Sequence, residues 1–224
     1  GLGIGDTILV CRAGDVIPKI LRVVMKNTPH AQVEPPTHCP VCNSVLVKVG
    51  ADLMCQNGWE CSAQTQRRFE HFVSRGALNI DGIGPSTLDC LIEAGKIQRP
   101  QDLFKLVATD FLELPGFAAT SARDCHVAIH TARKQNLHNF LYGLGIPEVG
   151  EGTSKRLSRR FATASEIAHA SYNDFKSIKD IGDETATSLV SWFKEPRNQE
   201  TYTALLEVLE ISNPLFNASN QDLA

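Results

Sequence analysis

The stretch Val149–Phe161, VGEGTSKRLSRRF, has a counterpart in Ile181–Phe193, IGDETATSLVSWF. In both stretches an apolar residue and a glycine come first, leucine follows seven residues after that glycine, and phenylalanine follows eleven after it. Two earlier stretches, DGIGPSTLDCLI from Asp81 and PGFAATSARDCH from Pro115, are looser copies. The glycines on which we align the four copies are Gly82, Gly116, Gly150 and Gly182. A period of a little over thirty residues predicts one supersecondary unit used four times.

Each of these glycines lies between two stretches of helical pattern. The shorter stretches before them are RRFEHFVSR, PQDLFKLV, LHNFLYGL and YNDFKSI, and a longer amphipathic stretch follows each glycine. Glycine lets the backbone turn through positive φ and lets a ligand approach closely. The second helix then presents free N–H groups and a partial positive charge, which suit a phosphate. The pattern therefore predicts turns that bind a nucleic-acid backbone without reading its sequence.

The four turns are not identical. Gly82-Ile83-Gly84 and Gly150-Glu151-Gly152 keep two glycines, whereas Ala118 and Glu184 take the second position in the other copies. The third turn is the strongest candidate because basic residues follow it, namely Lys155, Arg156, Arg159 and Arg160. Two plainer interpretations stay open: ordinary helical hairpins whose glycines allow tight packing, and a basic helix face that is merely solvated.

Four of the seven cysteines lie close together in the sequence, at Cys39, Cys42, Cys55 and Cys61. A C-x2-C pair followed by a second, looser pair predicts a tetrahedral zinc site, and four thiolates leave no open position for catalysis. Disulfides are disfavoured because no export signal is present and the cysteine count is odd. A redox pair is disfavoured because strand-like residues follow the C-x2-C pair. We interpret His38 as a bystander and the isolated cysteines as small buried residues; these are Cys11, Cys90 and Cys125.

The stretch Asp6–Met25, DTILVCRAGDVIPKILRVVM, predicts two β-strands around a polar turn, with Pro18 marking a bulge or an edge. An isolated pair of strands is only marginally stable in water. We therefore expect these two strands to be the last strands of a barrel whose earlier strands are missing. A small hairpin packed on the next domain is the alternative.

The formal net charge of −3 means that any DNA contact depends on local patches of positive charge. No apolar run in the sequence has the length of a membrane span.

In this order, the predicted elements resemble the C-terminal half of bacterial NAD-dependent DNA ligase. The similar motifs are GDTILVCRAGDVIPKI from Gly5, PTHCPVCNS from Pro36, HFVSRGALNIDGIG from His71 and FLYGLGIPEVGEGTSKRL from Phe140. The resemblance covers about residues 1–210 and implies an oligonucleotide-binding (OB) barrel, a zinc finger and a helix-hairpin-helix domain. It also implies a bacterial cytoplasmic, nucleoid-associated monomer that acts in replication and repair.

The resemblance implies that the parent enzyme uses NAD and Mg²⁺ to seal nicks between a 5′-phosphate and a 3′-OH. The nucleophilic lysine of that family lies in a Lys-x-Asp-Gly motif, which these 224 residues do not contain. We therefore expect this chain to bind nicked duplex DNA without ligating it. On the barrel motif, Arg12 and Lys19 would face the duplex, although such charges also protect an edge strand from aggregation.

We thus predict a mainly α chain with a small β part. The expected segments are barrel strands over 1–34, a four-cysteine zinc finger over 35–66, four helix-hairpin-helix repeats over 67–212 and a polar tail over 213–224. The predicted DNA-binding residues are Arg12, Lys19, Gly82, Ile83, Gly84, Gly116, Gly150, Gly152, Lys155, Arg156, Arg159 and Gly182. Two other functions stay open: a non-catalytic DNA-binding module of a repair factor, and a helical scaffold that binds protein.

Overall fold

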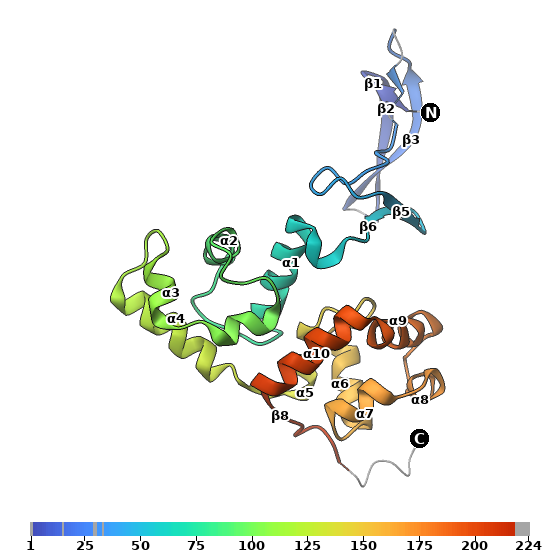
Figure 1. Ribbon diagram of the computed structural model, residues 1–224. Helices are drawn as coiled ribbons and strands as arrows, with labels where there is room; N and C mark the ends of the chain where they lie inside the picture. Colours follow the sequence, from blue (N-terminus) through green and yellow to red (C-terminus); the bar gives the residue numbers. More distant parts are fainter. Residues whose placement is uncertain (1, 15, 29–30, 33, 218–224) are drawn as a thin grey trace. The chain divides into compact units, whose positions relative to one another are not determined.

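The computed structural model describes residues 2–14, 16–28, 31–32 and 34–217, and it divides into two compact units, Gly1–Asn57 and Gly58–Ala224. The first unit is made of short strands (Figure 1). Its strands are β1 (Gly3–Ile4), β2 (Thr7–Ala13), β3 (Ile17–Met25), β4 (Ala31–Gln32), β5 (Leu46–Val49) and β6 (Asp52–Cys55). They pair antiparallel as β1 with β4, β2 with β3 and β5 with β6.

The predicted pair of strands forms as β2 and β3, and Pro18 lies on an edge strand of this two-stranded ribbon and not at a bulge. Pro18 pairs with Arg12 in regular register, and the irregularities lie between Thr7 and Ile8 and between Leu9 and Val10. Within the described residues β2 and β3 form a two-stranded ribbon and not a closed barrel. Large apolar side chains are exposed along this ribbon, among them Val10, Ile17, Ile20, Leu21 and Val24.

The second unit is helical. Its helices are η1 (Gly58–Glu60), α1 (Ser62–Val73), α2 (Pro85–Glu93), η2 (Pro100–Lys105), α3 (Ala108–Leu112), α4 (Ala119–Thr131), α5 (Leu137–Gly143), α6 (Glu151–Arg160), α7 (Ala164–His169), α8 (Tyr172–Lys176), α9 (Asp183–Lys194) and α10 (Pro196–Val208). Two short strands complete it, β7 (Lys134–Asn136) and β8 (Glu210–Ser212). In the described part of the chain, no helix combines the length and the apolar composition that a membrane span requires.

Four pairs of helices pack together across short turns: α1 with α2, α3 with α4, α5 with α6, and α8 with α9. The helix before Gly116 is α3, whereas the predicted stretch PQDLFKLV forms the separate 3-10 helix η2. Asp102 accepts the backbone N–H groups of Gln98 and Arg99 and thereby fixes the start of η2. The chain is extended at Val107, and the N–H of Val107 donates to Asp110, so a new helix begins there.

The second helix of each pair buries the same stripe toward one continuous core. The fourth residues after the four helix N-caps are fully buried; they are Leu88, Ala122, Ser154 and Ala186. The seventh residues are also buried; they are Leu91, Cys125, Leu157 and Leu189. Positions four and seven lie on one face of a helix, so this stripe is what fastens each hairpin to the core.

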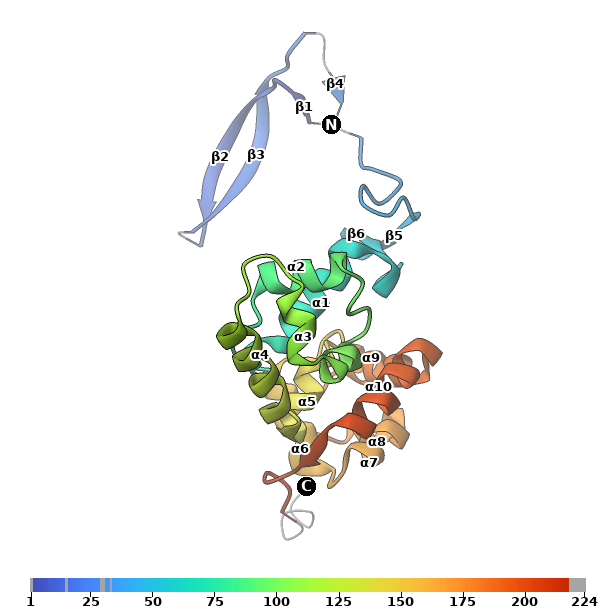
Figure 2. The same cartoon turned by 60° about the vertical axis from the view of Figure 1, so that its left-hand side comes forward.

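Contacts between distant segments hold the pairs together. Helix α10 packs against both η2 and α9, and Figure 2 shows it next to α9. The His71 ring hydrogen-bonds the Tyr142 carbonyl through Nε2 at 2.7 Å and packs edge-on against the Tyr142 ring. The parallel strands β7 and β8 pair Lys134 with Glu210 and Asn136 with Ser212. Residues 58–212 therefore share one hydrophobic core.

We expect Leu157→Ala to lower the free energy of unfolding by about 2–5 kcal/mol, because this fully buried side chain leaves a cavity in the core. Leu112→Ala is the matched control, since Leu112 is 48% exposed and should change stability by less than about 1 kcal/mol. Urea unfolding followed by circular dichroism measures both. Equal losses in the two variants would contradict the assignment of Leu157 to the core.

Candidate nucleic-acid interface and metal site

The four predicted cysteines come together. The sulfurs of Cys39, Cys42, Cys55 and Cys61 all lie within 4.8 Å of one another, and those of Cys42 and Cys55 are 3.5 Å apart. Four thiolates around one tetrahedral metal ion lie about 3.8 Å apart at metal–sulfur bonds of about 2.3 Å. The spacing of the sulfurs thus fits a single metal ion held by four cysteines.

The local fold explains how this sequence gathers the thiols. Asn43 takes positive φ after the Cys39–Cys42 turn, where the Cys39 N–H donates to Ser44 O and the Asn43 N–H donates to Cys39 O. The hairpin of β5 and β6 returns the chain to Cys55. Gly58, also at positive φ, precedes Cys61 at the start of α1. His38 hydrogen-bonds Thr37 through Nδ1 and is not part of the cluster.

The electrostatics of the cluster favour a bound cation. The Ser44 hydroxyl and backbone lower the pKa of Cys42 to about 6. The Asn57 backbone lowers the pKa of Cys55, but burial and the thiols of Cys42 and Cys39 outweigh it and raise the pKa to about 11. One thiolate thus opposes the ionisation of its neighbours, and a metal ion would relieve that repulsion.

The four hairpin turns share one backbone conformation. The residue that caps each second helix is extended, with φ between −120° and −81° and ψ between 169° and 179°. These N-cap residues are Gly84, Ala118, Gly150 and Gly182. Two residues earlier, each turn passes through positive φ, at Gly82, Gly116, Glu148 and Asp180.

This geometry corrects the alignment of the repeats by two residues in the third and fourth copies. Gly150 and Gly182 correspond to Gly84, and not to Gly82 as the glycine spacing predicted. Glu148 and Asp180 occupy the positive-φ position, a conformation that glycine adopts without strain. Gly152 and Glu184 are therefore the second residues of α6 and α9. The better sequence signal is the apolar residue just before each cap, namely Ile83, Phe117, Val149 and Ile181.

Glycine at the caps is required neither by the backbone nor by packing. Ala118 adopts the same extended conformation as the three glycines. A Cβ atom added to Gly84, Gly150 or Gly182 would meet no atom within 4 Å. Each cap therefore leaves space above the N-terminus of a helix, where another molecule can approach the backbone closely.

The turns lie in two pairs, and in each pair a helix of one hairpin contacts the turn of the other. The Cys125 thiol on α4 contacts the carbonyl of Gly82 in the first turn at 3.5 Å. In the later pair, Arg156 on α6 forms an ion pair with Asp180 at 3.3 Å. The Ser188 hydroxyl on α9 donates to the Pro147 carbonyl at 2.6 Å. The first and second turns thus form one pair, and the third and fourth form the other.

Charge distinguishes the four helix N-termini. The first turns of α2 and α4 contain no acidic residue. In α6 the acidic Glu151 pairs with Lys155 at 2.5 Å, which lowers the pKa of the carboxyl. In α9 Asp183 accepts from Tyr172 and pairs with Lys176, and these contacts lower its pKa; Glu184 adds a second carboxylate. The first two N-termini are the most open to an anion, and the fourth is the least.

The basic residues predicted to bind DNA have different surroundings. Lys155 and Arg156 form the ion pairs described above, while Arg159 is exposed at the end of α6. In the first unit, Arg12 on β2 and Lys19 on β3 are exposed. Ile83 is buried, so only its backbone can face a ligand.

Residues 139–201 match the family model described as a helix-hairpin-helix motif. The matched segment extends from α5 into α10 and contains the third and fourth turns. The match, together with the open helix N-termini, suggests a DNA-binding module in this part of the chain.

We expect the purified chain to carry one metal ion per molecule, and Cys42→Ser to reduce that ratio strongly, because one of four ligands is lost. Cys90→Ser is the control, since Cys90 lies outside the cluster. Elemental analysis of gel-filtered protein gives both stoichiometries. Metal content unchanged by Cys42→Ser would rule out this cluster as the binding site.

Proposed function

We propose that the chain binds duplex DNA by its sugar–phosphate backbone, through the N-termini of the helices that follow the hairpin turns. The observation that carries the proposal is the open space above the glycine caps Gly84, Gly150 and Gly182. Backbone N–H groups at a helix start donate to phosphate oxygens, and the helix dipole adds attraction. Because such contacts do not touch base edges, binding is independent of sequence.

The proposal extends the helix-hairpin-helix assignment to all four turns. The first and second turns lie outside residues 139–201, but they share the positive-φ position, the extended cap and the buried stripe of the matched turns. Two pairs of turns would then contact two places along a duplex. The helices α2 and α4, whose own first turns contain no carboxylate, would contribute most to this binding.

We further propose that the chain is the DNA-binding portion of an NAD-dependent DNA ligase. The order of elements supports this: a β-ribbon with exposed apolar side chains, then a four-cysteine cluster, then paired hairpins. The exposed apolar residues of β2 and β3 suit strands that complete an OB barrel. The parent enzyme, a cytoplasmic nucleoid-associated monomer in this proposal, would seal nicks with NAD and Mg²⁺ bound outside this chain.

In this proposal the metal is zinc. Cys39, Cys42, Cys55 and Cys61 would hold it, and as a structural ion with four sulfur ligands it supplies folding energy and no reaction chemistry. The chain's own residues bind and orient the nicked duplex. Exposed Arg12, Lys19 and Arg159 add attraction to phosphates. The Lys-x-Asp-Gly nucleophile is absent from these residues, so we expect no ligation by this chain alone.

We expect Gly84→Val and Gly150→Val each to weaken binding to a duplex about tenfold, because the new side chain occupies the space that a phosphate would approach. Fluorescence anisotropy with a labelled duplex measures the affinity. Ser191→Val, at an exposed site on α9 away from the caps, should bind normally. Thermal unfolding of all three variants separates loss of binding from loss of fold. Unchanged affinity in both glycine variants would refute binding through the caps.

We also expect binding to fall as salt rises, because phosphate contacts release counterions, and to favour a nicked duplex over an intact one of the same sequence. The measurement is anisotropy with both duplexes at two salt concentrations. Equal, salt-dependent binding to both would keep the backbone contacts but would assign nick recognition elsewhere, which fits a module of a repair factor equally well. Binding to neither duplex by metal-loaded protein would refute DNA binding and would favour a protein-binding scaffold.

A further inference from the structure

A cavity of about 560 Å³ lies within the helical unit, and none of the four cap residues of the hairpin turns lines it. It is bordered by α1, by the turn between α5 and α6, and by α9 and α10. Its buried lining is apolar and includes Phe72, Ile146 and Leu205. The chain has two tryptophans, and both of them, Trp59 and Trp192, line this cavity. Aromatic rings over an apolar floor suit a planar apolar ligand.

The charged side chains that line the cavity are all positive. Arg67 and Arg68 on α1 line the cavity and keep exposed surface, and no Asp or Glu is among the lining residues. This is notable in a chain whose formal net charge is −3. Two guanidinium groups at the solvent-facing side of an apolar cavity are suited to a carboxylate, sulfonate or phosphate.

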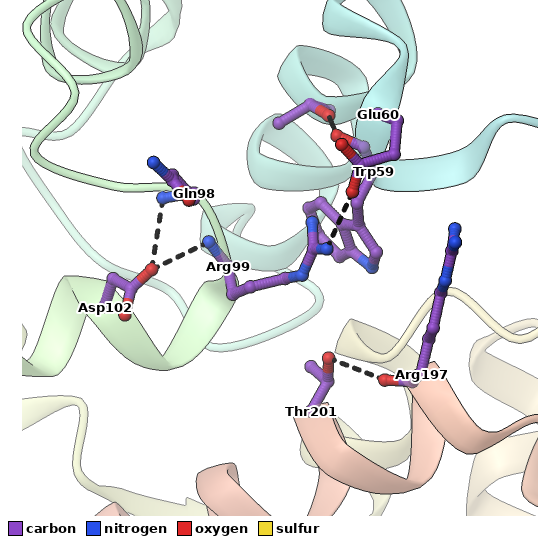
Figure 3. A network of polar contacts seen from close by, with 8 residues as sticks. Trp59, Glu60, Gln98, Arg99, Asp102, Arg197 and Thr201 are labelled. Carbon is purple, nitrogen blue, oxygen red and sulfur yellow. Dashed lines mark hydrogen bonds and ion pairs between the residues drawn. The ribbon is translucent and has the colours of Figure 1, made fainter.

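Arg68 has no anionic partner among the described residues. Its guanidinium lies 5.1 Å from the centroid of the Trp59 ring, and that of Arg99 lies 5.6 Å from the same centroid. Arg99 forms an ion pair with Glu60 at 3.0 Å, and Figure 3 shows this pair beside the indole of Trp59. For Arg68 the described residues provide no hydrogen bond or ion pair. Burial and the charge of Arg99 lower the pKa of Arg68, so a bound anion would relieve this crowding.

Other polar groups of the lining already have partners inside the protein. Asn198 donates to the Trp192 carbonyl at 3.1 Å, and the Thr201 hydroxyl donates to the Arg197 carbonyl at 3.1 Å, the latter drawn in Figure 3. His71 is held by the Tyr142 carbonyl. Recognition of a polar ligand group therefore falls to the arginines of α1, and the rest of the ligand meets an apolar surface.

We propose that this cavity binds a planar aromatic anion, with its ring system in the apolar interior and its anionic group at Arg67 and Arg68. The class includes aromatic carboxylates and sulfonates, and nucleoside monophosphates in which a base carries the ring and a phosphate the charge. No cap residue of a hairpin turn lines this cavity, so the proposal does not depend on DNA binding through the caps.

The test uses the two tryptophans as reporters. In a ¹H–¹⁵N correlation spectrum of the whole chain, their indole N–H groups give two signals, one for Trp59 and one for Trp192. Titration with naphthalene-2-sulfonate should shift both signals in a saturable way. Naphthalene-2-sulfonamide has the same ring without the charge and should bind at least tenfold more weakly, because it lacks the ion pair with arginine. Titration with adenosine monophosphate distinguishes nucleotides from other aromatic anions.

Arg68→Met keeps the long side chain over Trp59 but removes the charge, and it should weaken naphthalene-2-sulfonate binding about tenfold. Arg67→Met provides a second, independent measurement of naphthalene-2-sulfonate affinity if the first variant folds poorly. Arg123→Met is the control, because Arg123 is exposed on α4 outside the cavity. Signals that do not shift with either anion would overturn the proposal. Equal affinity for the sulfonamide, or full affinity in both well-folded α1 variants, would overturn it as well.

Discussion

Each hairpin turn must bury its apolar residue while it leaves the start of the next helix open, and the helical unit depends on this constraint. Ile83, Val149 and Ile181 are buried just before the caps, and Phe117 packs against the same core. Positive φ one residue earlier directs these side chains inward. The next residue then begins a helix whose first N–H groups have no partner within the helix. A surface suited to anions thus arises directly from the packing of the core.

Structural features that depend on residues close together in the chain were predictable from the sequence. The four cysteines come together because a tight turn, a short hairpin and a helix start bring ligands at Cys39, Cys42, Cys55 and Cys61 to one place. The repeat period and the second helix of each hairpin were also recognisable, although in the first pair α1 is longer than α2 and not shorter as predicted. The register of the later turns was wrong because we aligned glycines, whereas Glu148 and Asp180 hold the conformation that glycine holds at Gly82. The conformation of each turn is therefore set by the positive φ angle and by the buried apolar residue that follows it. It does not require glycine at the positive-φ position.

Other features depend on contacts between distant residues and gave no sequence signal. The stretch from Pro100 was predicted as the short helix before Gly116, but Asp102 and Asp110 each fix the start of a separate short helix. The basic residues of α6 were predicted to bind DNA, yet Arg156 forms an ion pair with Asp180 of the neighbouring turn. The cavity is formed by segments as far apart as Trp59 and Leu205. Such a site follows from how the helices pack, which no local pattern records.

The pairing of β7 with β8 has a consequence for how the later hairpins relate to the rest of the chain. These parallel strands bring Lys134–Asn136 and Glu210–Ser212 side by side. Just beyond β8, the Asn213 side chain donates to the carbonyls of Ser158 and Phe161 at the end of α6. The chain therefore enters and leaves this pair of hairpins at one place. The two ends of this segment lie side by side, while its interior shares one hydrophobic core with the earlier hairpins.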